Sequence, residues 1–176
     1  MTFEEKTISS ETIYEGKILT LKKDKVQTVS GESYRELIIH GGGAVIIGLT
    51  KSGKMLMVRQ YRKAIERDCF EVPAGKIDPG EDPIITAKRE LEEETGYRAG
   101  DIKFLSKFYP SVGYDNELLY LYIARDLEKT NTHFDPDEAL EIEEWEIQDL
   151  YEMVMSGKIE DAKSIIAILM IHDLYI

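Results

Sequence analysis

The chain has 176 residues, the length of one globular domain, and carries a formal net charge of −12 at pH 7. Hydrophobic residues make up 43% of it and charged residues 32%, which supports a folded core and excludes a wholly disordered chain. The acidic balance argues against nucleic acid or an anionic membrane as the main partner. The single cysteine, Cys69, cannot form an internal disulfide, and no apolar run approaches the ~20 residues of a membrane span. We therefore expect a cytoplasmic protein.

The first 40 residues predict a small antiparallel β unit. Short apolar and polar runs on either side of the turn signal Ser30-Gly31-Glu32 are typical of two or three strands. Three glycines follow at 41–43, and we interpret them as a hinge because no phosphate-loop motif surrounds them and a strand comes next. We therefore divide the chain into an N-terminal β-strand unit, 1–40, and a main domain, 41–176.

The main domain is predicted to combine strands with three helices, which places it in the α+β class. The clearest helix is 82–95, where Asp82 suits the N-cap, Pro83 the first helical position and Gly96 the stop. Strands are expected at 44–49, 54–61, 69–72, 104–108, 118–124 and 142–147, and further helices at 149–156 and 160–174.

The helix 82–95 carries an unusual group of acids. On a helical wheel Glu90, Glu93 and Glu94 share one arc of about 100°, directly beside the apolar stripe of the helix. Carboxylates crowded at a partly buried margin repel each other, and a hard divalent cation relieves that repulsion. Arg89 lies one turn before Glu93 and can orient it, while Glu81 supplies a nearby fourth acid. The competing interpretation is an ordinary solvated acidic helix face.

Residues 75–97, GKIDPGEDPIITAKRELEEETGY, resemble the Nudix box, G-x5-E-x7-R-E-U-x-E-E-x-G-U, in which U is usually a bulky aliphatic residue. Only the last position departs mildly, with Tyr97. Three further segments, 58–62, 71–75 and 109–113, are similar to the ADP-ribose and ADP-sugar pyrophosphatase branch of that family. The matching box residues are Gly75, Glu81, Arg89, Glu90, Leu91, Glu93, Glu94 and Gly96.

The resemblance implies the Nudix fold, an α/β/α sandwich with a mixed sheet, and an enzyme that acts on nucleotide sugars. The implied reaction is hydrolysis of the pyrophosphate bond of ADP-ribose to AMP and ribose 5-phosphate with Mg²⁺, or with Mn²⁺ as a substitute. It also implies a homodimer in which the N-terminal strands pack across or exchange between subunits. Open alternatives are another substrate (ADP-glucose, GDP-mannose or NADH), a non-catalytic ADP-ribose sensor, or a structural protein with an acidic surface helix.

By position in the box, the resemblance implies that Glu90 and Glu94 are the principal metal ligands. Glu93, also counted as catalytic, and the backbone carbonyl of Ala74 would complete or support the metal cluster. Glu81 would be a further ligand or a supporting carboxylate.

The family often places its catalytic base on a loop after the box, and the acidic segment 133–140 is the candidate here. Glu138 is favoured by its spacing, with Asp137 and Glu141 as rivals. For the substrate we expect an arginine to stack on adenine or contact phosphate. The predicted substrate-binding residues are Arg62, Arg59, Tyr61, Glu71 and Gly113.

Overall fold

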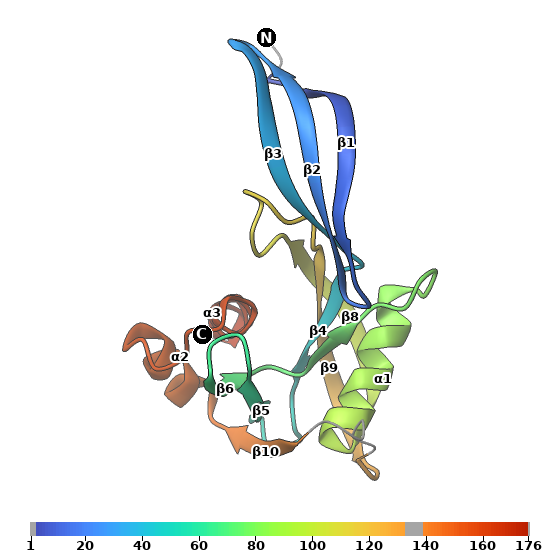
Figure 1. The fold of residues 1–176 in the computed structure, drawn as a ribbon. Coiled ribbons are helices and arrows are strands. Elements are labelled where there is room, and N and C mark those ends of the chain that lie inside the picture. The colour runs from blue at the N-terminus through green and yellow to red at the C-terminus, as the bar shows by residue number, and fades with distance from the viewer. Residues whose placement is uncertain (1–2, 133–138, 176) are drawn as a thin grey trace. The chain divides into compact units, whose positions relative to one another are not determined.

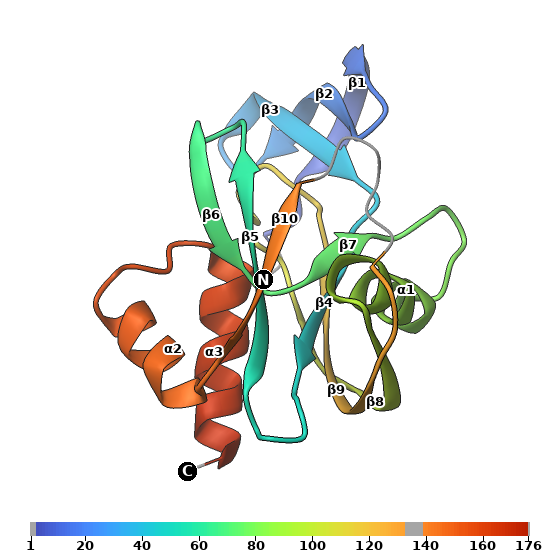
Figure 2. The same ribbon diagram turned by 90° about the horizontal axis from the view of Figure 1, so that it is seen from below.

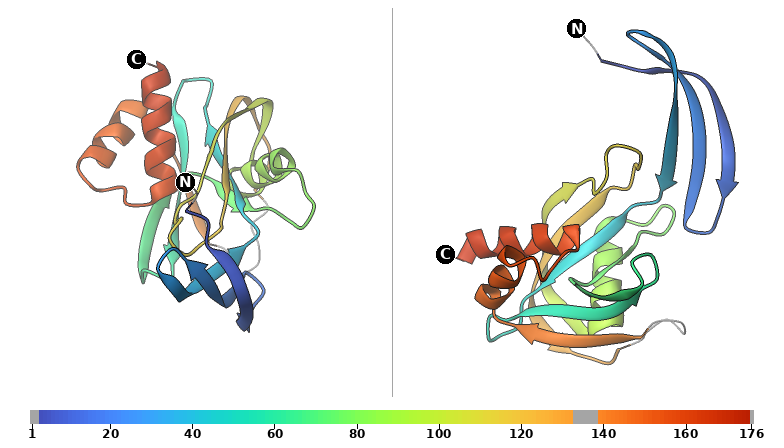
Figure 3. Two further views of the ribbon diagram at one scale, coloured as in Figure 1. Left: turned by 90° about the horizontal axis from the view of Figure 1, so that it is seen from above. Right: turned by 60° about the vertical axis from the view of Figure 1, so that its left-hand side comes forward.

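The structure is a computed structural model that describes residues 3–132 and 139–175 (Figures 1 and 3). The chain divides into two compact units. The first contains Met1–Gly42 together with Phe108–Leu118, and the second contains Gly43–Lys107 together with Leu119–Ile176.

In the first unit, strands β1 (Lys6–Glu15), β2 (Leu19–Thr28) and β3 (Gly31–His40) form an antiparallel sheet in that order. Thr28 pairs with Gly31, so the turn between β2 and β3 is centred on Val29 and Ser30. The sequence placed this turn one residue too late. The Thr28 side chain explains the difference, because its Oγ1 accepts a hydrogen bond from the backbone N–H of Ser30 and donates one to the carbonyl of Gly31.

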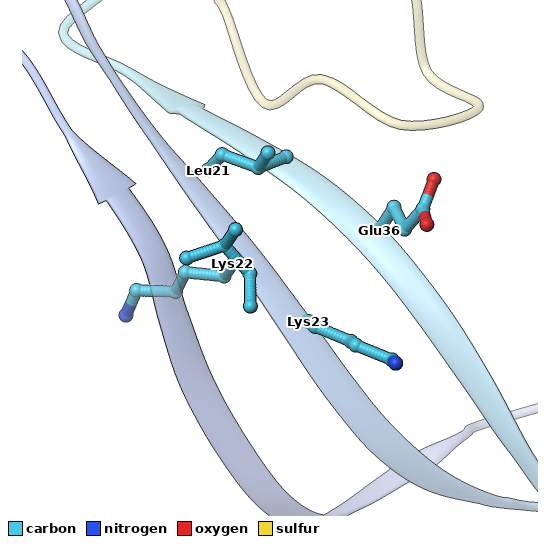
Figure 4. A pocket seen from close by; sticks show the side chains of 5 residues that line it. Leu21, Lys22, Lys23 and Glu36 are labelled. Atoms are coloured by element: carbon cyan, nitrogen blue, oxygen red, sulfur yellow. The ribbon is translucent and has the colours of Figure 1, made fainter.

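The first unit also contains a cavity of about 250 Å³ on its sheet. Figure 4 shows side chains from neighbouring strands around it, including Lys23 and Glu36. No residue that the sequence analysis assigned to catalysis, metal or substrate lines this cavity. The lining residues are Ile13, Leu21, Lys22, Lys23 and Glu36.

The strands of the second unit form two sheets. One is antiparallel, with the order β10-β5-β6, and the other has the order β7-β4-β9-β8. The second sheet is mixed, because β4 runs parallel to β9 and antiparallel to β7. The bounds are β4 Gly43–Gly48, β5 Met55–Arg62, β6 Arg67–Glu71, β7 Ala74–Lys76, β8 Tyr97–Phe108, β9 Leu119–Lys129 and β10 Leu140–Trp145.

Helix α1 (Pro83–Thr95) lies on one side of these strands, and α2 (Ile147–Met155) and α3 (Ala162–Tyr175) lie on the other (Figure 2). The predicted α+β class, with helices on both sides of a mixed sheet, is confirmed. In the part of the chain that the structure describes, no helix is long and apolar enough to cross a membrane.

Helix α1 begins and ends where the sequence predicts. Asp82 takes the N-cap position, where its side chain accepts a hydrogen bond from the N–H of Ile84, and Pro83 follows at the first turn. Gly96 ends the helix in the left-handed region with φ +66°, a conformation that favours glycine.

Several boundaries differ from the prediction. Strand β7 was not predicted, β8 begins at Tyr97 rather than at 104, and α3 begins at Ala162 rather than at 160. Strand β10 covers Leu140–Trp145 instead of 142–147, so Ile147 starts α2. The prediction placed β10 two residues too late. The hydrophobic pattern continues unchanged from the end of this strand into helix α2, so it does not mark the boundary.

The core of the second unit fixes the orientation of α1. Ala87 and Leu91 on α1 are fully buried against Ile46 of β4 and Leu56 of β5. Because the acids of α1 lie beside this apolar stripe, they are held at the margin of the core rather than in open solvent.

Candidate metal-binding site

Strand β7 and helix α1 bring three predicted metal ligands into one place. A Cβ on Gly75 would lie only 1.8 Å from Cδ of Glu90, so the Glu90 side chain occupies the space above this residue. The backbone N–H of Ala74 donates a 3.1 Å hydrogen bond to Oε2 of Glu94. Strand β7 is itself fixed by its pairing with β4, in which Val45 lies opposite Ala74. Ala74, Glu90 and Glu94 therefore surround one junction between strand and helix.

Arg89 links the remaining acids of the box. Its Nη1 donates to Oε1 of Glu90 at 2.6 Å and to Oε2 of Glu93 at 3.1 Å, and its Nη2 lies 3.4 Å from Oε2 of Glu81. Burial alone would lower the pKa of Arg89, but these carboxylates raise it above the ordinary value. A single guanidinium thus offsets much of the repulsion within the acidic group.

Thr86 is a supporting residue that the sequence analysis missed. It is fully buried, and its Oγ1 donates a 2.6 Å hydrogen bond to Oε2 of Glu81. This bond is the largest cause that lowers the pKa of the Glu81 carboxyl. The sequence indicates this contact only weakly, because Thr86 follows Glu81 by five residues near the start of the helix.

These residues fit a divalent cation by the chemistry of their donors. Carboxylate and carbonyl oxygens are the ligands that Mg²⁺ and Mn²⁺ prefer, and Glu94 is only 4% exposed. Among residues 3–132 and 139–175, however, no three acidic, histidine or cysteine side chains already converge on one point. Glu90 is turned towards Arg89, and Glu94 towards the N–H of Ala74. Cation binding therefore requires a shift that brings the oxygens of these two side chains together.

A second charged group lies at the end of β6. Glu71 is 2% exposed, and it accepts hydrogen bonds from Nε and Nη2 of Arg62 at 2.6 and 2.7 Å and a further bond from Lys163 of α3. Burial would raise the pKa of Glu71, but Arg62 and Lys163 outweigh that effect and lower it to about 2. Sequence reasoning missed Lys163, because it lies 92 residues from its partner and no local pattern connects them.

Three other residues were predicted to bind the substrate: Arg59, Tyr61 and Gly113. Arg59 of β5 lies opposite Glu141 of β10 and forms an ion pair with it, and Tyr61 is 56% exposed. Gly113 belongs to the first unit, where a Cβ would meet no atom within 4 Å. Glu138 and its rival Asp137 lie outside the described residues.

Replacing Gly75 with alanine is expected to weaken Mn²⁺ binding by roughly 10- to 100-fold, the range seen when the surroundings of metal ligands are disturbed. The added Cβ would overlap Glu90, so either that carboxylate or strand β7 must move. The measurement is titration of free Mn²⁺ by electron paramagnetic resonance, with thermal melting to show that the variant is folded. Unchanged Mn²⁺ affinity in a folded variant would show that Glu90 does not bind metal at this junction.

Comparison with known proteins places this geometry in a family. Residues 40–167 match the NUDIX domain, and residues 5–34 match the nucleoside diphosphate sugar hydrolase N-terminal domain. The chain is 40% identical to the methanol dehydrogenase activator of Bacillus methanolicus over 169 residues, 94% of this chain and 91% of that protein. It is 39% identical to the ADP-ribose pyrophosphatase of Bacillus subtilis (strain 168) over 170 residues, 95% of this chain and 92% of that one.

The crystal structure of an ADP compounds hydrolase has the same fold, with a TM-score of 0.85, 21% sequence identity, and coverage of 97% of this chain and 94% of that one. The predicted Nudix fold is thereby confirmed. Members of the family generally use divalent metal ions, in keeping with the oxygen donors gathered between α1 and β7. Because the family domain matches well over half of the chain, and two relatives match nearly all of it at 39–40% identity, the chain belongs to the NUDIX family.

Proposed function

We propose that this protein hydrolyses the pyrophosphate bond of ADP-ribose, releasing AMP and ribose 5-phosphate, with Mg²⁺ as the metal ion and Mn²⁺ as a possible substitute. The observation that carries the proposal is the junction of β7 with α1, where Ala74 and Gly75 lie against Glu94 and Glu90. The similarity to an ADP-ribose pyrophosphatase over 95% of the chain supports the choice of substrate.

In this proposal Glu90, Glu94 and the carbonyl of Ala74 hold the metal, with Glu93 and Glu81 as further ligands or supports. When bound, Mg²⁺ would neutralise charge on the diphosphate and lower the pKa of a bound water. Arg89 orients Glu90 and Glu93 through its hydrogen bonds. The positive charge of the bound metal would also let an anionic substrate approach a protein whose net charge is −12.

The predicted substrate residues take separate roles in the proposal. Arg62 contacts a phosphate or stacks on adenine, since Glu71 fixes its guanidinium through two hydrogen bonds while its side chain stays 44% exposed. Glu71 is too deeply buried to be the main contact, so it acts by holding Arg62. Arg59, Tyr61 and Gly113 remain proposed substrate contacts.

The proposed base is Glu138, with Asp137 and Glu141 as rivals and Glu93 as a second catalytic carboxylate. Among these, Glu141 is ion-paired with Arg59 and its side chain is 65% exposed. The Glu141 carboxylate is therefore already engaged by a guanidinium on the neighbouring strand. Glu138 is favoured by its spacing in the sequence.

We also propose that residues 1–40 form a unit that mediates a homodimer, and that the protein is cytoplasmic. The sheet of the first unit exposes large apolar side chains, which mark interaction surfaces when they gather on one face. Size-exclusion chromatography with light scattering measures the oligomeric state, and a monomer at micromolar concentration would contradict the proposal. The exposed side chains are Ile8, Ile13, Tyr14 and Tyr34 on the strands, with Ile18 just before β2.

A second candidate function is activation of a dehydrogenase, which the 40% identity to the methanol dehydrogenase activator favours. Adding this protein to the methanol dehydrogenase of Bacillus methanolicus and following methanol oxidation tests it. Faster oxidation with the wild type but not with Glu94→Gln would support this function and tie it to the same site.

The experiment that tests the main proposal is a product assay with ADP-ribose, ADP-glucose, GDP-mannose and NADH, each with Mg²⁺ and with a chelator. We expect AMP and ribose 5-phosphate from ADP-ribose at the highest kcat/KM, and no products with the chelator. Faster release of GMP from GDP-mannose would move the substrate to that alternative. Binding of ADP-ribose without cleavage of any compound would indicate the sensor.

A further inference from the structure

A short link, residues 71–74, connects β6 to the strand that faces the candidate metal site. The carbonyl of Pro73 accepts a 2.9 Å hydrogen bond from the N–H of Ile46 in β4, and the N–H of Ala74 is bonded to Glu94 in α1. The proline ring fixes its own φ, which makes the link stiff. A displacement at the start of the link is therefore passed on to Ala74.

The start of the link is tied to helix α3 by a buried hydroxyl. Ser164 is completely buried, and its Oγ accepts a 2.8 Å hydrogen bond from the N–H of Val72. The same hydroxyl donates its proton to Oδ2 of Asp161 at 2.5 Å. A backbone N–H can only donate, so the hydroxyl accepts from Val72 and its own hydrogen is left to donate to Asp161. A carboxylate that accepts a hydrogen bond from the hydroxyl makes the hydroxyl oxygen a stronger acceptor for Val72.

This hydroxyl is not needed to start helix α3. Asp161 caps the helix by accepting a 3.0 Å hydrogen bond from the backbone N–H of Ser164, and its carbonyl accepts the N–H of Ile165 at 2.9 Å. An alanine at position 164 would keep both bonds. An alanine would remove the bond to Asp161 as well, but Asp161 keeps its backbone partners, whereas Val72 loses the acceptor that Ser164 provides.

We propose that Ser164 is a positioning residue for the metal site, which it serves by fixing Val72 and, through the link, the carbonyl of Ala74 and its neighbour Glu94. This inference rests on one part of the proposed function, namely that Ala74 and Glu94 are metal ligands. Lys163 reinforces the same anchor, since it bonds to Glu71 and lies 3.1 Å from Asp161.

The test compares Ser164→Ala with the wild type by Mn²⁺ titration without substrate, and by the Mg²⁺ dependence of ADP-ribose hydrolysis. We expect the Kd for Mn²⁺ and the half-saturating Mg²⁺ concentration to rise about tenfold, within the range for residues that orient metal ligands. Turnover at saturating Mg²⁺ should recover towards that of the wild type. Ser164→Thr keeps the hydroxyl and should bind Mn²⁺ almost as well as the wild type.

The matched control is Ser156→Ala, which removes an exposed hydroxyl bonded to the carbonyl of Glu152 at the end of α2 and should leave metal affinity unchanged. Wild-type Mn²⁺ affinity in Ser164→Ala, with or without a lower Tm, would overturn the inference. If the alanine variant does not fold, Ser164→Cys, with its weaker acceptor, should give an intermediate Kd, and a wild-type Kd would overturn the inference. A wild type that binds Mn²⁺ but cleaves no nucleotide sugar would refute the proposed function alone, because the Mn²⁺ comparison still tests Ser164.

Discussion

Replacing Glu94 with glutamine is expected to lower kcat for ADP-ribose by about a thousandfold. A bound divalent cation contributes several kcal/mol of transition-state stabilisation, and each ~1.36 kcal/mol corresponds to a factor of ten in rate. Glutamine keeps the length of the side chain and an oxygen that accepts the N–H of Ala74, but it loses the charge that holds the metal. The measurements are kcat across a Mg²⁺ titration and the rise in Tm that Mg²⁺ produces, which the variant should lose.

The matched control is Glu92→Gln, on the same helix. Glu92 pairs with Arg98 at 2.7 Å and is not among the predicted ligands, so both turnover and the Mg²⁺-dependent rise in Tm should stay within about twofold of the wild type. Two outcomes contradict the assignment. One is wild-type turnover in Glu94→Gln. The other is an equal loss of turnover in Glu92→Gln, which would show that the acids of α1 act only through their total negative charge.

Sequence predicted the parts of the fold that depend on local chemistry. The bounds of α1 were correct because Asp82, Pro83 and Gly96 each act within one turn of the helix end. Strand β7 was missed because three residues carry no periodic pattern and exist as a strand only by pairing with β4, some 30 positions earlier in the sequence. The turn between β2 and β3 was displaced by one residue because the Thr28 hydroxyl closes it.

The candidate site divides in the same way. Helical spacing alone places Glu90, Glu93 and Glu94 on one face of α1, and the ion pair of Arg89 with Glu93 is present. The contacts with the link could not be predicted, because Ser164 lies 92 residues from Val72 in the sequence. Long-range pairs of this kind depend on where α3 docks, and a hydrophobic pattern does not encode that placement.

Replacing Glu138 with glutamine is expected to lower kcat by about 10²- to 10⁴-fold, the usual contribution of a general base, while KM changes little. The physical reason is that proton transfer from water is made only in the transition state, so the ground-state complex keeps its affinity. Steady-state kinetics at saturating Mg²⁺ provide the measurement, with ADP-ribose binding to the variant measured separately by calorimetry.

Asp137→Asn and Glu141→Gln, assayed in parallel, distinguish the rivals by how kcat and KM change. Glu141 holds Arg59, a proposed substrate contact, so its loss should change KM more than kcat. A large fall in kcat with constant KM in either variant, together with nearly normal turnover in Glu138→Gln, would transfer the role of base to that residue. The comparison works because a base affects only the reaction step, whereas a residue that positions Arg59 affects binding as well.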